Sequence, residues 1–457
     1  MEEGEGMKAR GKREKWLTAA YLAVFFLLAL TLAAFQPLRD PEGLTSPPDE
    51  SDRYAVPRFI YEHGALPTGL EEELRIPGYG SSYGLYNVFP YIVMGGVMRL
   101  AGLFTRDPGA LLLSARLVNV VSGLLMAWVV RKLSRLLFAK PAWQWLFCLL
   151  IVYQPMNIFV HSYVNTDSFC MLSTAMMVYA LVRLRRDGMS VPSCLWLAGG
   201  MSLCVLSYYN GYGYILCGAI LFISYFAGER RFDWKGMWRW GLLTAGVVIL
   251  LSGWWFVRAY IVLDGDILGF RTQNELALRY GAYTVSPMNT YQARSVGIAG
   301  MLRDMLARRF FFKVAGTLIA AYGSLTLRSY LVYSVYFLIW GAGFAGCVAA
   351  FLRVLKARRG WRYWFFHLTL LFCVLIPFIL YLRYCYAYDY QEQGRYLLPS
   401  LVPAMYYVAS GLRELSDRLS RRAPQPARAL PAVCGILIVC CALWQVFAVA
   451  LPAYLAG

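Results

Sequence analysis

Residues 16–35 read WLTAAYLAVFFLLALTLAAF and contain no charged side chain, while the residues just before them form a basic run that ends at Lys15. An α-helix rises about 1.5 Å per residue, so about twenty apolar residues cross the roughly 30 Å hydrocarbon layer of a membrane. The apolar run is too long for a typical signal peptide. It therefore predicts a first transmembrane helix that is not cleaved from the protein.

The same pattern recurs along the whole chain. The 457 residues are 59% hydrophobic and only 15% charged, whereas a soluble domain carries about 25% charged residues. We therefore expect an all-α polytopic membrane protein, a single transmembrane domain over residues 1–457 with about eleven transmembrane helices and no soluble C-terminal domain. The expected spans are residues 16–36, 110–130, 142–160, 168–184, 192–209, 212–227, 241–262, 329–352, 364–384, 396–412 and 430–451.

Basic clusters predict the orientation of these spans, because Lys and Arg in short loops stay on the cytoplasmic side. The clusters are residues 8–15, 131–140, 183–186, 230–239, 353–362 and 413–428. The eleven spans place all six clusters on one side, which puts the N-terminus in the cytoplasm and the C-terminus outside. This topology explains the net charge of +18 without nucleic acid, so membrane lipids are the expected partners and nucleic acid is not.

Two long segments between spans are expected on the outer side of the membrane. Residues 37–108 form the first outer loop, in which the short apolar stretch 91–104 is expected as a juxtamembrane helix lying at the surface. Residues 264–328 form the second outer loop, whose many basic side chains call for an anionic partner. These side chains include Arg271, Arg279, Arg294, Arg303, Arg308, Arg309 and Lys313.

The first outer loop begins with the acidic run Ser46-Pro-Pro-Asp-Glu-Ser-Asp-Arg-Tyr54. The carboxylates of Asp49, Glu50 and Asp52 repel one another, which raises at least one pKa and suits a general base or a metal site. Any metal here would be Mg²⁺ or Mn²⁺, although the pattern requires no cofactor. A solvated acidic turn has the same pattern, so both interpretations stay open.

A second polar group lies where the third and fourth spans meet on the outer face. It consists of His161, Asn165 and Asp167 within the run His161-Ser-Tyr-Val-Asn-Thr-Asp167. Asn165 and Asp167 are candidates for a site, but either could equally cap the next helix by accepting hydrogen bonds from its free N–H groups.

Two arginines at the outer ends of spans are candidates for binding phosphate. Arg395, followed by Tyr396, enters the tenth span, where its planar fork could bind a phosphate at headgroup level or simply snorkel to the interface. Arg258 lies in an otherwise apolar turn of the seventh span. Charge inside a membrane is costly, so Arg258 is expected to have a partner or a function.

Together these motifs resemble the GT-C superfamily, the multispan glycosyltransferases that take sugars from polyprenyl-phosphate carriers on the outer face of the membrane. Asp49-Glu50 followed by Arg53-Tyr54 resembles the Asp-Glu motif in the first outer loop of protein mannosyltransferases and lipid A aminoarabinose transferases. Further details are similar to a bacterial branch of GT-C-like membrane proteins. They are Pro47-Pro-Asp-Glu50, Asn165-Thr-Asp167, the Asp-Gly-Asp-Ile-Leu-Gly that ends at Gly269, and the Gln-Gly-Arg-Tyr-Leu-Leu-Pro of 393–399.

The resemblance, which spans residues 17–412, implies roles for matching residues. Asp49 would be the base that deprotonates an acceptor hydroxyl, and Glu50 would orient it or a neighbouring group. Asp167 matches a second acidic position on the outer face. Arg395 would hold the carrier phosphate, assisted by Arg271 or Arg258. The other candidates for the pocket are Asp52, Arg53, Asn165, His161 and Tyr396, and Arg53 stands where many relatives have a histidine.

We therefore expect a glycosyltransferase of the bacterial cytoplasmic membrane that moves a sugar from a polyprenyl-phosphate carrier to a cell-envelope glycan, lipid or protein on the outer face. One alternative is a polysaccharide ligase or polymerase with a polyprenyl-diphosphate donor, for which residues 271–309 supply arginines. Another is a flippase or transporter of lipid-linked sugars, although the polar residues gather at one face rather than at the midplane. A nucleotide-driven pump is disfavoured, because the sequence has no phosphate-binding loop.

Overall fold

The computed structural model describes residues 2–39, 46–86, 88–228, 231–285, 287–357 and 359–456, with the side chains of residues 2–11 and 210 excepted. Residues 40–45 and 87 of the expected first outer loop, residue 286 of the second, and residues 230 and 358 of two basic clusters lie outside these ranges. The described chain is all-α, as expected. Isolated β-bridges join Ala227 with Phe232 and Tyr322 with Leu327.

Seven helical segments of the described chain are long and apolar enough to cross a membrane. They belong to α1 (Glu2–Phe35), α4 (Pro108–Leu137), α7 (Asp167–Asp187), α10 (Trp234–Val262), α14 (Tyr330–Lys356), α15 (Trp361–Ala387), and the continuous run of α17 (Pro424–Leu443), the π-helical η5 (Trp444–Ala450) and α18 (Leu451–Ala456). Each of the seven coincides with an expected span.

The other four expected spans are shorter or interrupted, so the described residues do not reach eleven by this measure. The stretch 142–160 breaks into α5 (Pro141–Val152) and α6 (Pro155–Val160), because a proline lacks the N–H that would continue the helix. The stretches 192–209 and 212–227 contain α8 (Val191–Val205) and α9 (Tyr212–Tyr225), joined by the 3₁₀ turn η3 (Tyr209–Gly211). The last begins with the 3₁₀ helix η4 (Gly394–Ser400) before α16 (Leu401–Leu419).

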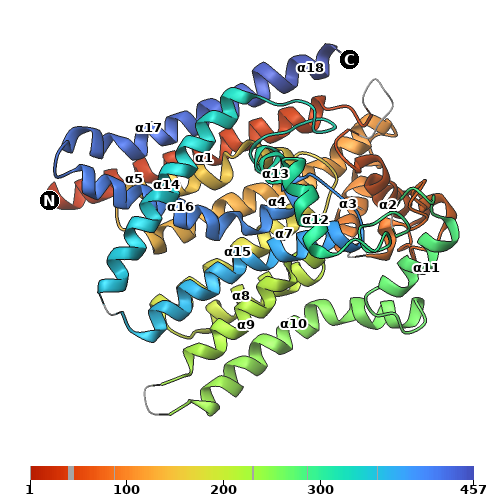
Figure 1. Ribbon diagram of the computed structural model, residues 1–457, viewed down its shortest axis with the longest axis horizontal. Coiled ribbons are helices and arrows are strands. Elements are labelled where there is room, and N and C mark those ends of the chain that lie inside the picture. Colours follow the sequence, from red (N-terminus) through yellow and green to blue (C-terminus); the bar gives the residue numbers. More distant parts are fainter. Residues whose placement is uncertain are drawn as a thin grey trace.

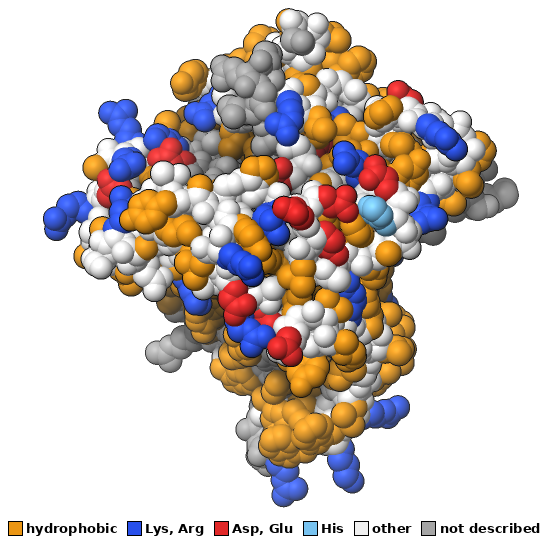
Figure 2. All heavy atoms as spheres, turned by 90° about the vertical axis from the view of Figure 1, so that its right-hand side faces the viewer, with side chains coloured by type: hydrophobic (Ala, Val, Ile, Leu, Met, Phe, Trp, Pro, Cys, Tyr) orange, Lys and Arg blue, Asp and Glu red, His pale blue; other side chains and the backbone are white. Residues whose placement is uncertain are grey.

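Short helices gather at one end of the bundle, on the right of Figure 1, which we call the loop end. They are α2 (Glu50–His63), η1 (Glu72–Leu74), η2 (Tyr83–Leu85), α3 (Phe89–Ala101) and α11 (Phe270–Tyr280), with α12 (Ile298–Ala307) and α13 (Phe310–Ile319) beside them. Figure 2, which looks onto this end, shows acidic and basic side chains intermingled on it. The expected helix at 91–104 corresponds to α3, which packs between α2 and α4.

Small residues let two of the long helices approach closely. A β-carbon on Gly411 of α16 would collide with the carbonyl oxygen of Gly343 in α14, and one on Gly346 would collide with the carbonyl oxygen of Gly411. Glycine contacts of this kind are a common way for membrane helices to pack. The α14–α16 pair is therefore packed closely, backbone against backbone.

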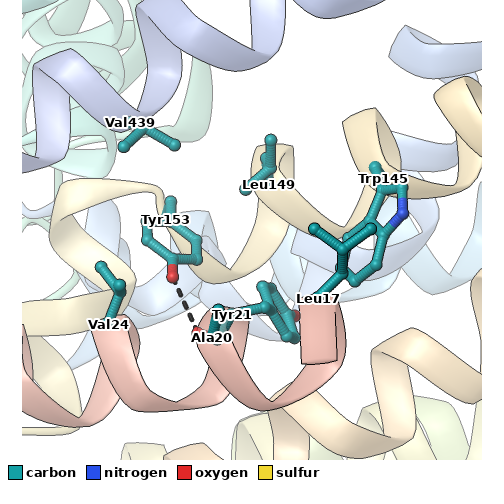
Figure 3. Close-up of a pocket in the computed structure, with 8 residues that line it drawn as sticks. All are labelled: Leu17, Ala20, Tyr21, Val24, Trp145, Leu149, Tyr153 and Val439. Atoms are coloured by element: carbon teal, nitrogen blue, oxygen red, sulfur yellow. Dashed lines mark hydrogen bonds between the residues drawn. The ribbon is translucent and has the colours of Figure 1, made fainter. Parts of the chain in front are cut away.

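A groove lies between α1, α5 and α17, near the middle of α1 and away from the loop end of the bundle (Figure 3). It has a volume of about 310 Å³ and apolar walls formed by Leu17, Ala20, Val24, Trp145, Leu149 and Val439, with Tyr21 and Tyr153 beside them. The hydroxyl of Tyr153 donates a hydrogen bond of 2.7 Å to the carbonyl oxygen of Tyr21. The groove thus offers no charged group for chemistry, and the candidate site lies elsewhere.

Candidate active site

The site is built on the turn that precedes α2. After Pro47 and Pro48, Asp49 adopts a left-handed backbone conformation with φ of 62°, which aspartate tolerates better than most residues. Its side chain makes no capping hydrogen bond to α2. It keeps 34% of its surface exposed, so a substrate group can reach this carboxylate.

Two buried arginines hold the carboxylate of Asp49. Arg395, at the start of η4, contacts Asp49 Oδ2 directly and also donates to the carbonyl oxygen of Pro48 at 3.4 Å and to the hydroxyl of Tyr163 at 3.3 Å. Arg53, one turn along α2, has Nη2 3.8 Å from the same Oδ2. Burial alone would raise the pKa of Asp49, but the charges of Arg395 and Arg53 outweigh it and lower that pKa. The carboxylate is therefore ionised.

Asp167 lies near Arg53 and interacts with it electrostatically. Nη1 of Arg53 is 3.5 Å from both the hydroxyl of Thr166 and the hydroxyl of Tyr91, and the guanidinium stacks over the ring of Tyr83 at 4.5 Å. Asp167 is only 3% exposed, and neither of its carboxylate oxygens has a hydrogen-bond partner in the described part of the chain. It interacts electrostatically with both Arg53 and Arg395. The cluster thus contains two carboxylates and two guanidiniums.

Glu50, although adjacent to Asp49 in sequence, faces away from this cluster. Its side chain is fully buried and is held by Arg116 of α4, whose Nε lies 2.8 Å from Oε1 and whose Nη2 contacts Oε2. The N–H of Val164 also donates to Oε1 at 2.8 Å. Arg116 further donates to the carbonyl oxygens of Ala33 and Gln36, both at 2.9 Å. Glu50 therefore fastens α2 to α1, α4 and the turn before α7.

The predicted carboxylate set for a metal is consequently not assembled. Arg116 and the N–H of Val164 occupy Glu50, and no group of three or more His, Cys, Asp or Glu side chains in the described ranges is placed to hold a metal ion. Asp52 stays half-buried near Asp49: burial first, and then the charge of Asp49, raise the pKa of Asp52. Its environment differs from that of Glu50 even though both lie in the first turn of α2.

His161 and Asn165 have structural contacts. His161 is fully buried, and its Nδ1 lies 2.8 Å from the carbonyl oxygen of Asn157. Asn165 accepts a hydrogen bond of 3.1 Å from the N–H of Ser168 and donates to the carbonyl oxygen of Val160 at 2.7 Å. Of the two capping candidates, Asn165 therefore caps α7, while Asp167 keeps its carboxylate available to the cluster.

Gly394 explains how Arg395 reaches the site. A β-carbon at this position would collide with the backbone of α13 at Val314 and Leu318. The N–H of Gly394 donates to the hydroxyl of Thr317 at 2.8 Å. Only glycine lets η4 lie this close to α13. Tyr396 then stacks on the ring of Tyr381 in α15 with 5.3 Å between centroids, so η4 also packs against α15.

The other two predicted phosphate ligands hold loop backbone instead. Arg258 donates to the carbonyl oxygen of Pro67 at 2.6 Å, and Arg271 donates to the carbonyl oxygen of Asp264 at 2.7 Å. In the described chain, neither forms a hydrogen bond or ion pair with Asp49 or Arg395. The partner expected for Arg258 is thus a loop carbonyl.

Sequence reasoning did not single out Asp389, a further carboxylate near the cluster. Its Oδ2 accepts a hydrogen bond of 3.0 Å from the hydroxyl of Tyr79, which joins the first outer loop to the segment between α15 and η4. Burial, and to a smaller extent the charge of Asp49, raise the pKa of Asp389 even though hydrogen bonds from Gln391 and Tyr79 oppose the rise. Tyr79 lies in a Tyr/Gly-rich run, and this composition alone gives no indication of the pairing.

Helices long and apolar enough to cross a membrane, with a polar cluster at the loop end, define the class of a polytopic membrane protein. The chain belongs to the family described as predicted membrane protein (DUF2142), whose family model matches residues 50–403. A comparison with curated protein sequences finds no match.

Solved structures with a similar fold include the oligosaccharyltransferase of Archaeoglobus fulgidus in its apo form, at 15% identity and a TM-score of 0.56 over 96% of this chain and 56% of that one. The oligosaccharyltransferase AglB from Archaeoglobus fulgidus, in complex with an inhibitory peptide and a dolichol-phosphate, gives 15% identity and a TM-score of 0.50 over 96% of this chain and 56% of that one. ArnT from Cupriavidus metallidurans bound to undecaprenyl phosphate gives 14% identity and a TM-score of 0.53, over 94% of this chain and 77% of that one. The chain spans little more than half the length of the archaeal enzyme, and at these identities the likeness concerns the fold.

Proposed function

We propose that the protein is a glycosyltransferase that moves a sugar from a polyprenyl-phosphate carrier to a cell-envelope acceptor on the outer face of the bacterial cytoplasmic membrane. The observation that carries the proposal is the contact between Asp49 and Arg395 at the loop end of a GT-C-like fold. Structures of this fold have been solved with dolichol-phosphate and with undecaprenyl phosphate, which supports a carrier of this class.

Arg395 is the proposed ligand of the carrier phosphate. Its guanidinium can present two parallel N–H donors to phosphate oxygens, and Arg53 lies close enough to share the charge, since both approach Asp49 Oδ2. An incoming phosphate competes with Asp49 for Arg395. Because Arg395 is the strongest influence that lowers the pKa of Asp49, this competition raises that pKa and makes the carboxylate a better base at the moment when donor is bound.

The proposed step is a direct displacement at the anomeric carbon. Asp49 takes the proton of the acceptor hydroxyl, and the hydroxyl oxygen forms a bond to that carbon. The bond from the carbon to the phosphate oxygen breaks, and its electron pair stays on the phosphate. Arg395 stabilises the negative charge that grows there. Attack from the face opposite the phosphate inverts the configuration at the anomeric carbon.

The test is Asp49→Asn in purified protein reconstituted in lipid, with transfer from polyprenyl-phosphate sugars as the readout. Mass spectrometry of co-purifying lipid chooses the donor. Asparagine tolerates the left-handed backbone of position 49, so the fold is kept while transfer falls about 100-fold or more. Asp264→Asn is the matched control, because Asp264 is also left-handed, with φ of 49°, and is exposed at the loop end. Transfer near the wild-type rate in Asp49→Asn disproves the assignment of the base.

A polysaccharide ligase or polymerase that uses a polyprenyl-diphosphate donor is the second candidate. It is favoured by one observation, a cavity with three cationic side chains beside η4, which offers contacts for a second phosphate. Comparing transfer from monophosphate and diphosphate carriers separates the two candidates, since the first proposal expects the monophosphate to be the better donor.

A further inference from the structure

A polar cavity of about 840 Å³ opens at the loop end between α13, the loop 320–329 and the segment before η4. Its walls include Arg308, Lys313, Arg328 and the single carboxylate of Glu392, with the amide of Gln393 and the ring of Tyr390 among them. The volume lies within the range of about 300–1,000 Å³ that is usual for small-molecule sites, and it exceeds what one phosphate group needs.

The cavity lies next to the two chain segments that carry Asp49 and Arg395. On one side, Glu392 and Gln393 of the wall lead directly into Gly394 and Arg395. On the other side, a β-carbon built on Gly323 of the loop 320–329 would lie 3.5 Å from Ser46 Oγ, at the start of the turn that carries Asp49. The cavity is therefore bordered by the two segments that carry Asp49 and Arg395.

The wall formed by the loop 320–329 is fixed by several elements. Tyr322 and Leu327 pair through backbone hydrogen bonds of 3.1 and 3.2 Å, and the fully buried Tyr322 donates from its hydroxyl to the carbonyl oxygen of Pro155 at 2.8 Å. From the C-terminal helices, Gln445 donates to the carbonyl oxygen of Leu327 at 3.0 Å, and the hydroxyl of Tyr454 accepts from the N–H of Gly323 at 3.2 Å. The cavity is therefore preformed.

The charges of the lining favour an anion. Lys313 is paired with Glu392, whose carboxylate oxygens lie 2.9 and 2.7 Å from its Nζ, and Arg308 is paired with Asp304 at 2.9 Å. Arg328 donates from Nε to the carbonyl oxygen of Leu325 at 2.7 Å but pairs with no carboxylate among the described residues. The charge of Arg328 thus faces the cavity without a carboxylate partner. Lys313 beside it can exchange Glu392 for an anion that binds more strongly.

Resting on the proposed function, we infer that this cavity is the acceptor subsite and that it binds an acidic sugar unit, one that carries a carboxylate or phosphate, within reach of Asp49. The shared chemistry is an anionic group held by Arg328 and Lys313. The volume favours an acidic glycan as its source over the second phosphate of a diphosphate carrier, because a sugar ring with its anionic group fills more of the cavity.

The test is a binding measurement on the full chain in nanodiscs, with trigalacturonate and neutral maltotriose as probes. Wild-type protein is expected to bind trigalacturonate about tenfold more tightly. Arg328→Gln is expected to remove most of that difference, whereas Arg303→Gln, an exposed arginine of α12 that does not line the cavity, keeps it. Equal binding of the two probes by wild-type protein, or equal losses in the two variants, overturns the inference.

A variant in the opposite direction guards against simple loss of folding. Glu392→Gln removes the one carboxylate of the lining and releases Lys313, so binding of trigalacturonate is expected to tighten by about threefold or more. A damaged protein does not gain affinity. Unchanged or weaker binding in Glu392→Gln contradicts the assignment of Lys313 and the acceptor subsite with it.

Two further measurements are needed. The first distinguishes an acidic glycan from the carrier diphosphate as the source of the anion, and the second distinguishes the acceptor subsite from the function proposed for Asp49. If Arg328→Gln weakens binding of undecaprenyl diphosphate but leaves trigalacturonate unaffected, the cavity serves the carrier and the acceptor assignment is wrong. Asp49→Asn is expected to lose transfer while it still binds trigalacturonate. Retained transfer in that variant together with the predicted binding pattern refutes the function proposed for Asp49 and leaves the anionic subsite supported.

Discussion

Asp49 and Arg395 form a direct ion pair although 346 positions separate them in the chain. The turn before α2 and the start of η4 bring them together, and Arg395 also contacts the carbonyl oxygen of Pro48 in that turn. If a donor phosphate binds Arg395, it competes with Asp49 for that arginine, and the basicity of the Asp49 carboxylate changes when the donor binds. The proposed chemistry depends on this relationship, and it can be measured through the pKa of Asp49.

The pH dependence of transfer should report that pKa. The pKa of Asp49 is lowered because Arg395 and Arg53 outweigh the effect of burial, so the base stays deprotonated until the medium is strongly acidic. Arg53→Gln removes one of the two charges and raises the pKa of Asp49. A base with a higher pKa is protonated at a higher pH, so the acidic limb of the kcat/KM profile is expected to move to higher pH.

Arg303→Gln serves as the control for that measurement, because it removes an exposed arginine of α12 that has no contact with Asp49 in the described residues. Its acidic limb should coincide with that of the wild type. An acidic limb that Arg53→Gln leaves in place would mean that Asp49 is not the group whose protonation stops the reaction.

The buried ion pair between Glu50 and Arg116 is expected to affect the stability of the fold rather than the transfer reaction. Glu50→Gln leaves the guanidinium of Arg116 buried, at 3% exposure, without its counter-charge, and breaking a buried pair in this way costs about 3–5 kcal/mol. We expect a lower unfolding temperature and a lower yield of Glu50→Gln, with transfer per folded molecule near the wild-type value. The double variant Glu50→Gln/Arg116→Met is expected to recover part of the stability.

The opposite pattern would reverse the assignments. If Glu50→Gln unfolds at the wild-type temperature but loses transfer, Glu50 acts on the substrate after all. Asp49→Asn measured beside it supplies the contrast, since the half-buried carboxylate of Asp49 is expected to affect transfer far more than unfolding.

The long spans could be predicted because a run of about twenty apolar residues matches the thickness of a bilayer and is rare in soluble domains. The shorter ones were harder. Pro155 lies inside the expected span 142–160, and hydropathy does not register that a proline ends α5 and starts α6. In the same way, the mean hydropathy of the expected span 396–412 does not show that this span begins within the 3₁₀ helix η4. The start of α6 is held by a contact distant in sequence, because the carbonyl oxygen of Pro155 accepts a hydrogen bond from Tyr322 in the loop 320–329.

The site was only partly predictable from the sequence. Asp49, Asp167 and Arg395 are predicted from polar runs on the outer face, and Arg53 from the resemblance, and the structure brings these four together. Glu50 was grouped with Asp49 because the two are adjacent, yet neighbouring residues of a helix point roughly 100° apart, and Glu50 faces α4 instead.

Arg116 carried a signal that the sequence analysis did not use. It is a charge within the apolar block 110–130, the same feature that drew attention to Arg258, and such charges usually have a partner. The pairing of Asp389 with Tyr79 had no signal, because the two lie 310 positions apart in segments whose tyrosines also suit a membrane interface.

Gly394 should be irreplaceable even though it has no side chain to act on a substrate. Gly394→Ala drives a methyl group into the backbone of α13, so η4 must shift and carry Arg395 away from Asp49. We expect transfer to be lost, with stability lowered by about 1–3 kcal/mol. Gly297→Ala is the matched control, since a β-carbon there meets no atom within 4 Å in the described chain. Wild-type transfer in Gly394→Ala would show that the position of Arg395 is not critical.

Removing divalent metal ions should leave transfer unchanged. Arg395 contacts Asp49 and Arg53 Nη2 lies 3.8 Å from its Oδ2, so two positive charges disfavour a cation at this carboxylate. Glu50 cannot assist, because Arg116 and the N–H of Val164 hold it. Initial rates before and after treatment with EDTA, and after addition of Mg²⁺ or Mn²⁺, check this expectation. Transfer that stops in EDTA and returns with Mn²⁺ would contradict it. The ligand would then be Asp167, whose buried carboxylate oxygens have no hydrogen-bond partner in the described residues. In that case Asp49 would act on the metal rather than as a free base.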